Sequence, residues 1–210
     1  MNTAVLIGVI ILIGLGLGWV LHHRSVRHMM PILRRLAAEG NVVVKSQNLL
    51  GMPKLLFSYA GTDVEVSSAT TVIDGNSGEY TFVLFKGLRF NHFEFRILPR
   101  SLQTMADEWA GFKNPMDIDL GEIKECLSIN TNDDRMIEAV LSESIQADLL
   151  FWPSGERENR ISDIRNYDSN LIYAVTGRLN KYEEYKLLLA SACRFFDRVN
   201  NVASHSSHES

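Results

Sequence analysis

Residues 92–97 read HFEFRI, in which polar and apolar side chains alternate without a break. Successive side chains of a β-strand point to opposite faces, so this alternation predicts a strand with one buried face and one water-facing face. The polar face carries His92, Glu94 and Arg96. We therefore expect the strand to lie in a sheet that packs against a core on its other side.

Further β-rich runs precede this strand at short intervals. They occupy residues 41–46, 54–59, 64–67 and 80–85. Strong turn signals lie between them, at residues 59–63 and 74–78. Successive short strands joined by tight turns predict an antiparallel β-meander.

The second half of the chain mixes strands with helices. We expect helices over residues 99–110, 132–151 and 181–199, and short strands at 127–129, 161–165 and 171–175. In the last two helices apolar residues return every three to four positions, which is typical of a helix with one buried side. We therefore expect an α+β domain over residues 41–200 and a polar, disordered tail over residues 201–210.

The run Ala4–Leu21 holds eighteen consecutive residues without a charge. As a helix it would be about 27 Å long, close to the hydrocarbon thickness of a bilayer. A secretory signal peptide is the alternative, but no Lys or Arg precedes the run and no small-residue cleavage site follows it. The expected fold is therefore one N-terminal transmembrane helix within residues 1–21, followed by a cytoplasmic α+β domain with an antiparallel meander and packed helices.

The flanks of this run predict its orientation and contacts. Basic residues follow it and none precedes it, so the positive-inside rule places the N-terminus outside and the domain in the cytoplasm. Gly14 and Gly18 form a GxxxG pair that favours helix–helix contact, either with a second copy or with another membrane protein. Residues 22–40 are expected to form a basic juxtamembrane helix. The expected membrane-interface residues are Trp19, Arg24, Arg27, Arg34 and Arg35.

Charge and cysteine content limit the classes of partner. Residues 1–45 carry five basic residues and one acidic residue, a net charge of +4. Because the whole chain carries −4, the remaining residues sum to −8. An acidic domain lacks the electrostatic footprint of a nucleic-acid binder, so no nucleic-acid partner is expected. Cys126 and Cys193 fit a reducing compartment, although two cysteines could also pair in an oxidising one.

Candidate chemistry is sparse. The sequence has no P-loop, HExxH, GxSxG or CxxC motif. Four weaker patterns are interpreted as ordinary surface or interface residues rather than as haem, cation, acid–base or metal sites. They are His22 with His23, the acidic group Asp117, Asp119, Glu122 and Glu125, the strand face His92, Glu94 and Arg96, and His205 with His208. We therefore expect no catalytic residue, no cofactor and no metal.

The order of segments in the second half resembles a family of bacterial single-pass, membrane-anchored α+β proteins of unknown function. The resemblance covers residues 80–198 and is carried by the segments 96–100, 117–122 and 127–132. The chain departs from the family pattern at residues 124–127, where KECL replaces a Phe-Asp motif. The resemblance implies a membrane-tethered module and transfers no catalytic residue.

These observations favour a non-enzymatic accessory or scaffold subunit. Its single helix would dock onto a larger membrane protein complex, for example a respiratory or photosynthetic one, and its domain would brace that complex on the cytoplasmic side. The alternative is a free-standing, membrane-tethered binding or sensing domain. An enzyme with a site assembled from distant residues is a third alternative.

Overall fold

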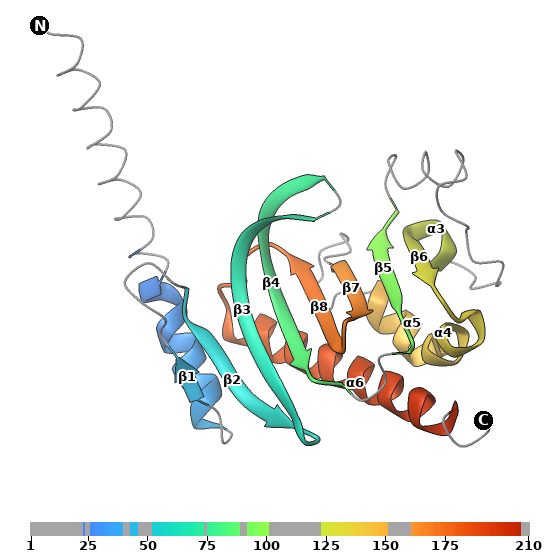
Figure 1. Ribbon diagram of the computed structural model, residues 1–210. Helices are drawn as coiled ribbons and strands as arrows, with labels where there is room; N and C mark the ends of the chain where they lie inside the picture. The colour runs from blue at the N-terminus through green and yellow to red at the C-terminus, as the bar shows by residue number, and fades with distance from the viewer. Residues whose placement is uncertain are drawn as a thin grey trace, which may run out of the picture.

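Alternating apolar residues build an eight-stranded antiparallel sheet at the centre of the computed structural model (Figure 1). The structure describes residue 23 and residues 26–39, 43–45, 52–73, 75–88, 92–100, 123–150 and 161–206. The strands are β1 (Val43–Lys45), β2 (Lys54–Tyr59), β3 (Thr62–Ile73), β4 (Asn76–Lys86), β5 (Phe95–Pro99), β6 (Leu127–Thr131), β7 (Ile161–Tyr167) and β8 (Asn170–Thr176). Their order in the sheet is β1-β2-β3-β4-β8-β7-β5-β6, so the first four strands form a meander.

Two-residue turns fix the register of two of the hairpins. Ala60 and Gly61, between β2 and β3, both have positive φ angles, of 49° and 79°. Asp168 and Ser169, between β7 and β8, also have positive φ angles. Two successive residues with positive φ form the type I′ turn, whose twist matches that of the strands it joins.

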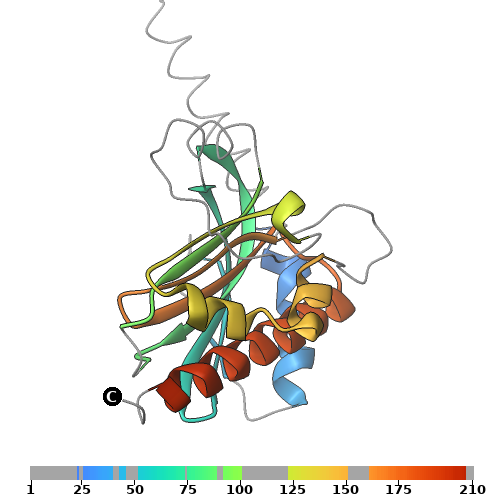
Figure 2. The ribbon, with the colours of Figure 1, turned by 90° about the vertical axis from the view of Figure 1, so that its right-hand side faces the viewer.

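The described helices all pack on one face of the sheet (Figure 2). They are a helix over residues 26–38, α3 (Ile123–Cys126), α4 (Asp134–Val140), α5 (Glu143–Leu150) and α6 (Tyr182–Ser206). On α6, Phe196 stacks on Phe85 of β4 with 4.6 Å between ring centroids. The Tyr59 hydroxyl donates a hydrogen bond of 2.8 Å to Asp197, which ties β2 to the same helix. This hydrogen bond raises the pKa of Tyr59 to about 12.

Two helices differ from their expected lengths. The single helix expected over residues 132–151 is two helices, because the chain leaves the helical conformation at Leu141 (ψ 52°). The Gln146 side chain donates to the Leu141 carbonyl at 2.7 Å and so satisfies an acceptor at this break. The last helix continues to Ser206 instead of ending near Val199, because Ala203 is buried in the core. Residues 207–210 lie outside the described residues.

Among the helices that the structure describes, none combines the length and the apolar character that crossing a membrane requires. The longest, α6, has 25 residues but carries charged side chains along its outer side. This finding overturns the expected fold class, with its single transmembrane helix, and the expected single-pass location with an outside N-terminus and a cytoplasmic domain. The run Ala4–Leu21, with Gly14, Gly18 and Trp19, lies outside the described residues, as does Arg24.

The basic segment expected beside the membrane packs onto the domain itself. Met29 and Leu33 of the helix over residues 26–38 are buried in the core of the protein. The guanidinium carbon of Arg35 lies 3.9 Å from the centroid of the Tyr182 ring of α6, a cation–π contact. The apolar side of this helix is therefore occupied by protein, while Arg27 and Arg34 are exposed.

Both cysteines are free thiols with different surroundings. Cys126 is exposed, whereas Cys193 is half-buried on α6, and burial raises the pKa of its thiol to about 11. Since the thiolate is the reactive form, only about one Cys193 in a thousand is reactive at pH 8. We expect maleimide to modify one thiol in the native protein at pH 8, and two after unfolding. The variant Cys126→Ser should then give no native labelling, and rapid labelling of that variant would contradict the assignment.

Candidate binding site

One face of the sheet is not covered by any described helix, and we call it the open face. Its centre is apolar, because Leu84 of β4 lies opposite Ile172 of β8 and both side chains are half-buried. The next strand across continues this row with Arg165, which lies opposite Ile172. The row therefore changes from apolar to basic within one strand spacing, about 4.8 Å.

Two arginines lie directly opposite each other on the open face. The register pairs Arg96 of β5 with Arg165 of β7. Like charges at directly opposed positions destabilise a sheet unless another group compensates them. The compensating group is Asp163, two residues before Arg165 on the same strand and therefore on the same face.

Asp163 binds both arginines from a buried position, since its relative exposure is only 2%. Arg96 donates two hydrogen bonds to the carboxylate, from Nε at 3.0 Å and from Nη2 at 3.1 Å. Arg165 forms a looser ion pair, with 3.6 Å between its Nη1 and the same carboxylate. One carboxylate thus holds two guanidinium groups, and this Arg96–Asp163–Arg165 cluster has a net charge of +1. The donors of Arg165 are beyond hydrogen-bond distance of Asp163 and can bind another acceptor.

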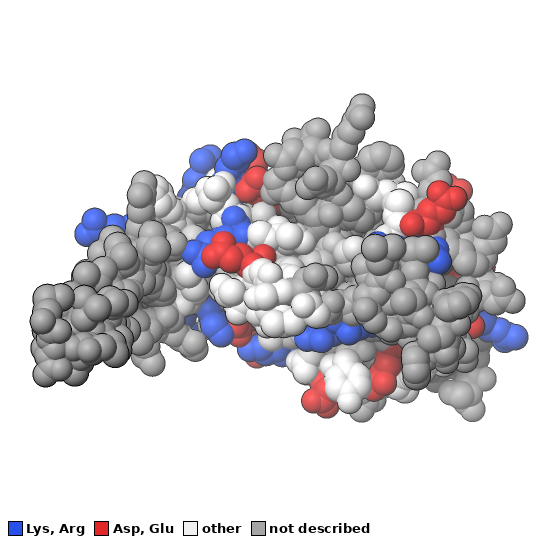
Figure 3. Space-filling model, turned by 90° about the horizontal axis from the view of Figure 1, so that it is seen from above, with Lys and Arg blue, Asp and Glu red and all other residues white. Residues whose placement is uncertain are grey.

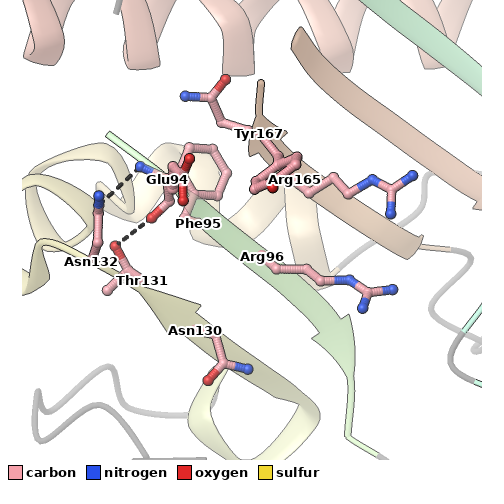
Figure 4. A pocket seen from close by; sticks show the side chains of 9 residues that line it. Glu94, Phe95, Arg96, Asn130, Thr131, Asn132, Arg165 and Tyr167 are labelled. Atoms are coloured by element: carbon pink, nitrogen blue, oxygen red, sulfur yellow. Dashed lines mark hydrogen bonds between the residues drawn. The ribbon is translucent and has the colours of Figure 1, made fainter. Parts of the chain in front are cut away.

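A groove of about 470 Å³ opens beside this cluster, between β6, β5 and β7 (Figure 4). It is lined by Glu94, Phe95, Arg96, Asn130, Thr131, Asn132, Arg165, Asn166 and Tyr167. In Figure 4 the side chains of Arg96 and Arg165 extend in the same direction and away from Glu94. Tyr167, at the rim, is 65% exposed, which is unusual for a large aromatic side chain.

The end of the groove at Glu94 is held in place by hydrogen bonds between side chains and the backbone. Asn132 accepts from the Glu94 backbone N–H at 2.9 Å and donates to the His92 carbonyl at 2.7 Å. The Thr131 hydroxyl donates to the Glu94 carbonyl at 3.1 Å. These three bonds join β6 to the start of β5, so the groove is preformed.

A second cluster of charges lies on the other side of the apolar centre. Glu65 of β3 is 7% exposed and pairs with Lys54 at 2.6 Å and with Lys86 at 2.7 Å. Burial of the carboxyl raises its pKa, but the hydrogen bonds and charges of the two lysines outweigh burial. The pKa of Glu65 is therefore below its usual range. This Lys54–Glu65–Lys86 cluster also carries a net charge of +1, and it borders a smaller groove of about 340 Å³.

Replacing Glu65 with glutamine is expected to lower the free energy of unfolding at pH 7 by about 1–2 kcal/mol, because two charge-assisted hydrogen bonds are lost. A carboxyl whose pKa is lower in the folded state than in the unfolded state stabilises the protein at pH values above its pKa in the unfolded state. This contribution disappears as the pH falls through the pKa of the folded state. Urea unfolding of both proteins between pH 7 and pH 2 should therefore show a difference that shrinks in acid. A difference independent of pH would contradict the assignment.

Seen from above, basic and acidic side chains alternate around a patch of uncharged residues (Figure 3). This mixture of basic, acidic and uncharged groups is suited to binding a partner. Of the strand face His92, Glu94 and Arg96, the arginine donates to Asp163 and the histidine is exposed. The sequence reasoning missed Asp163, Arg165 and Tyr167, although their spacing of two residues within β7 is the same signal that identified β5.

The structure describes only some residues of the other candidate groups named from the sequence. Within the described residues no three His, Cys, Asp or Glu side chains lie close enough to hold a metal ion. His22, Asp117, Asp119, Glu122 and His208 lie outside those residues. Glu125 is exposed in the first turn of α3.

Comparison with known proteins gives one structural likeness and no family. No family model matches the chain, and no curated protein matches it. The fold is similar to the crystal structure of the mycobacterial trehalose monomycolate transport factor A, TtfA, with a TM-score of 0.42 and 13% sequence identity. That match covers 80% of this chain and 81% of the TtfA chain.

Proposed function

We propose that this chain is a non-enzymatic accessory or scaffold protein that binds a partner protein through the open face of its sheet. In this proposal the Arg96–Asp163–Arg165 cluster receives an acidic side chain of the partner. The observation that carries the proposal is the pairing of two arginines on one buried carboxylate at the edge of a groove, with the donors of Arg165 beyond hydrogen-bond distance of that carboxylate.

Charge supports an acidic partner. Residues 46–210 sum to −8, yet each of the two clusters on the open face carries +1. A basic area on an otherwise acidic domain attracts an acidic surface. Arginine binds a carboxylate with two parallel N–H donors, so it adds geometric specificity to the attraction.

The groove includes side-chain types that are common at protein interfaces. Arg and Tyr are enriched among the residues that contribute most to binding at protein interfaces. Arg165 is ion-paired with Asp163, and the half-buried Leu84 and Ile172 supply an apolar surface beside it. Arg96 is already held by two hydrogen bonds to Asp163, so its use in binding costs little conformational entropy.

Site-specific photo-crosslinking tests the proposal. A benzophenone side chain at position 167 should give one discrete adduct with a partner in the native cell, whereas one at exposed position 138 on α4 should not. Arg165→Glu should abolish the adduct, because the carboxylate it introduces repels an acidic partner. An adduct that forms equally at both positions, or that persists in Arg165→Glu, would contradict the proposal. Without crosslinking, co-purification of the partner in a fixed stoichiometry indicates an accessory subunit, and in a variable one a free-standing binding domain.

A further inference from the structure

One row of residues crosses the open face and connects its two charged clusters. Glu65 of β3 lies opposite Leu84 of β4, which in turn lies opposite Ile172 of β8. Ile172 also lies opposite Arg165 of β7, on its other side. Residues directly opposite each other share a face of the sheet, so the row has two charged ends and an apolar middle. Glu65 and Arg165 are three strand spacings apart, which is about 14 Å.

The end of the row at Glu65 carries an excess of positive charge, as the arginine end does. Lys54 and Lys86 both pair with the Glu65 carboxylate and remain partly exposed. Lys45 lies directly opposite Lys54, and it lines the same groove as Glu65 and Lys86. Asp63 lies opposite Lys86 on this face. Three lysines and two carboxylates leave a net charge of +1, so both ends of the row attract an anionic group.

We propose that the open face binds an extended segment of a partner protein, which lies across the strands and presents acidic side chains at positions i and i+4 with an apolar side chain at i+2. One carboxylate binds Arg165, and the other binds Lys86 at the opposite end of the row. The apolar side chain covers Leu84 and Ile172 between them. This inference rests on the proposed partner-binding function and defines the chemistry of the partner.

The length of the row favours an extended segment over a helical one. In an extended chain the residues i, i+2 and i+4 point to the same side, and i and i+4 are about 13–14 Å apart. On a helix, residues of one side recur after seven or eleven positions, which correspond to about 10.5 and 16.5 Å. The row of about 14 Å matches the extended spacing and lies between the two helical ones. The residue at i+2 then faces the apolar middle of the row.

The sequence of this chain shows that the segment belongs to another protein. Acidic residues four positions apart occur in it only as Asp134 and Glu138, with Met136 midway between them. These three residues belong to the helix α4, and Met136 is buried in the core. They are therefore not available in the extended conformation that the row requires.

Fluorescence anisotropy of the full chain with two labelled heptapeptides tests the spacing. The first peptide has glutamate at its second and sixth positions, leucine at its fourth and serine elsewhere. The second has the same composition, but its glutamates are at the third and fifth positions. We expect the second peptide to bind about fivefold more weakly or worse, because it reaches only one end of the row and turns its leucine away.

Three variants of the protein identify the two ends of the row. Arg165→Gln and Lys86→Gln should each weaken binding of the first peptide about two- to fivefold, because each removes one ion pair with the peptide. Glu65 keeps its contact with Lys54 at 2.6 Å in the Lys86 variant, so the sheet stays intact. The matched control is Lys181→Gln, just before α6, where the side chain is 74% exposed. This variant should bind like the wild type.

Methyl NMR spectra of the wild-type chain report on the apolar middle without any variant. The methyl signals of Leu84 and Ile172 should shift with the first peptide, and less with a peptide whose leucine is replaced by serine. Leu188, which is buried on α6, should not shift with either peptide.

Failure of this inference differs from failure of the partner-binding proposal. Equal binding of the two heptapeptides, no binding of either, or binding that depends on Arg165 but not on Lys86 would overturn the extended segment. The crosslink from position 167 and its loss in Arg165→Glu would still support a partner at the arginine cluster. Absence of that crosslink would overturn the partner-binding proposal itself.

Discussion

Replacing Arg96 with methionine is expected to lower the free energy of unfolding by about 3 kcal/mol. Asp163 is 2% exposed and receives its two hydrogen bonds from Arg96, so the substitution leaves a buried carboxylate with only a looser ion pair at 3.6 Å. Removing one partner of a buried ion pair costs more than the pair contributes, because the remaining charge is not compensated. Urea or guanidinium unfolding at pH 7 measures the difference.

Two further variants identify the cause of this loss. Arg96→Met combined with Asp163→Leu should recover most of the stability, because replacing both members of a buried pair by apolar residues is often neutral. Arg165→Met should cost less than about 1 kcal/mol, because this side chain is half exposed and its ion pair is long. If Arg165→Met is as destabilising as Arg96→Met, or the double variant is no more stable than Arg96→Met alone, the account of this cluster is wrong.

Replacing Phe196 with alanine is expected to have the largest effect in the core, a loss of about 3–5 kcal/mol. Phe196 is 2% exposed and stacks on Phe85, with 4.6 Å between ring centroids and 11° between ring planes. The ring centroid of Tyr59 lies 5.8 Å from that of Phe196, in an edge-to-face arrangement. The substitution removes buried area and two aromatic contacts, and it leaves a cavity between α6 and the sheet. Thermal and chemical unfolding both measure the loss.

The matched control is an aromatic residue that contributes no core packing. Tyr167 is 65% exposed at the groove, so Tyr167→Ala should change the free energy of unfolding by less than about 0.5 kcal/mol. Phe196→Leu should lie between the two, since it keeps part of the buried volume. A Phe196→Ala protein as stable as the Tyr167→Ala protein would show that α6 does not pack as described.

Local patterns predict the strands of this sheet well but not their order. The alternation in HFEFRI places Phe95 in the core and Arg96 on the open face, as expected for a period of two. The sequence does not show that β5 pairs with β7 and with β6, because the pairing of strands distant in sequence depends on packing that no local pattern contains. For the same reason the partner of Arg96 could not be predicted, although Asp163 has the same spacing within its own strand.

The N-terminal half illustrates a second limit. The helix over residues 26–38 has an amphipathic pattern that suits either a lipid surface or a protein surface. Its apolar residues Met29 and Leu33 pack in the core, and Arg35 lies over Tyr182. Hydrophobic periodicity shows that a face is buried but not what buries it. The break at Leu141 was missed because the apolar spacing continues across it, and the break depends on backbone hydrogen bonds to neighbouring side chains.

The most direct test of the central claim, that the Arg96–Asp163–Arg165 cluster binds an acidic group, is an NMR titration of the arginine Nε–Hε signals with an acetylated, amidated hexaglutamate peptide. We expect the signals of Arg96 and Arg165 to shift in a saturable manner, and the shifts to weaken as salt is added. Arg135, which is exposed on α4 and is not among the residues that line the groove, is the internal control and should not shift. Shifts of Arg135 as large as those of Arg165, or no shift at either groove arginine, would contradict the account.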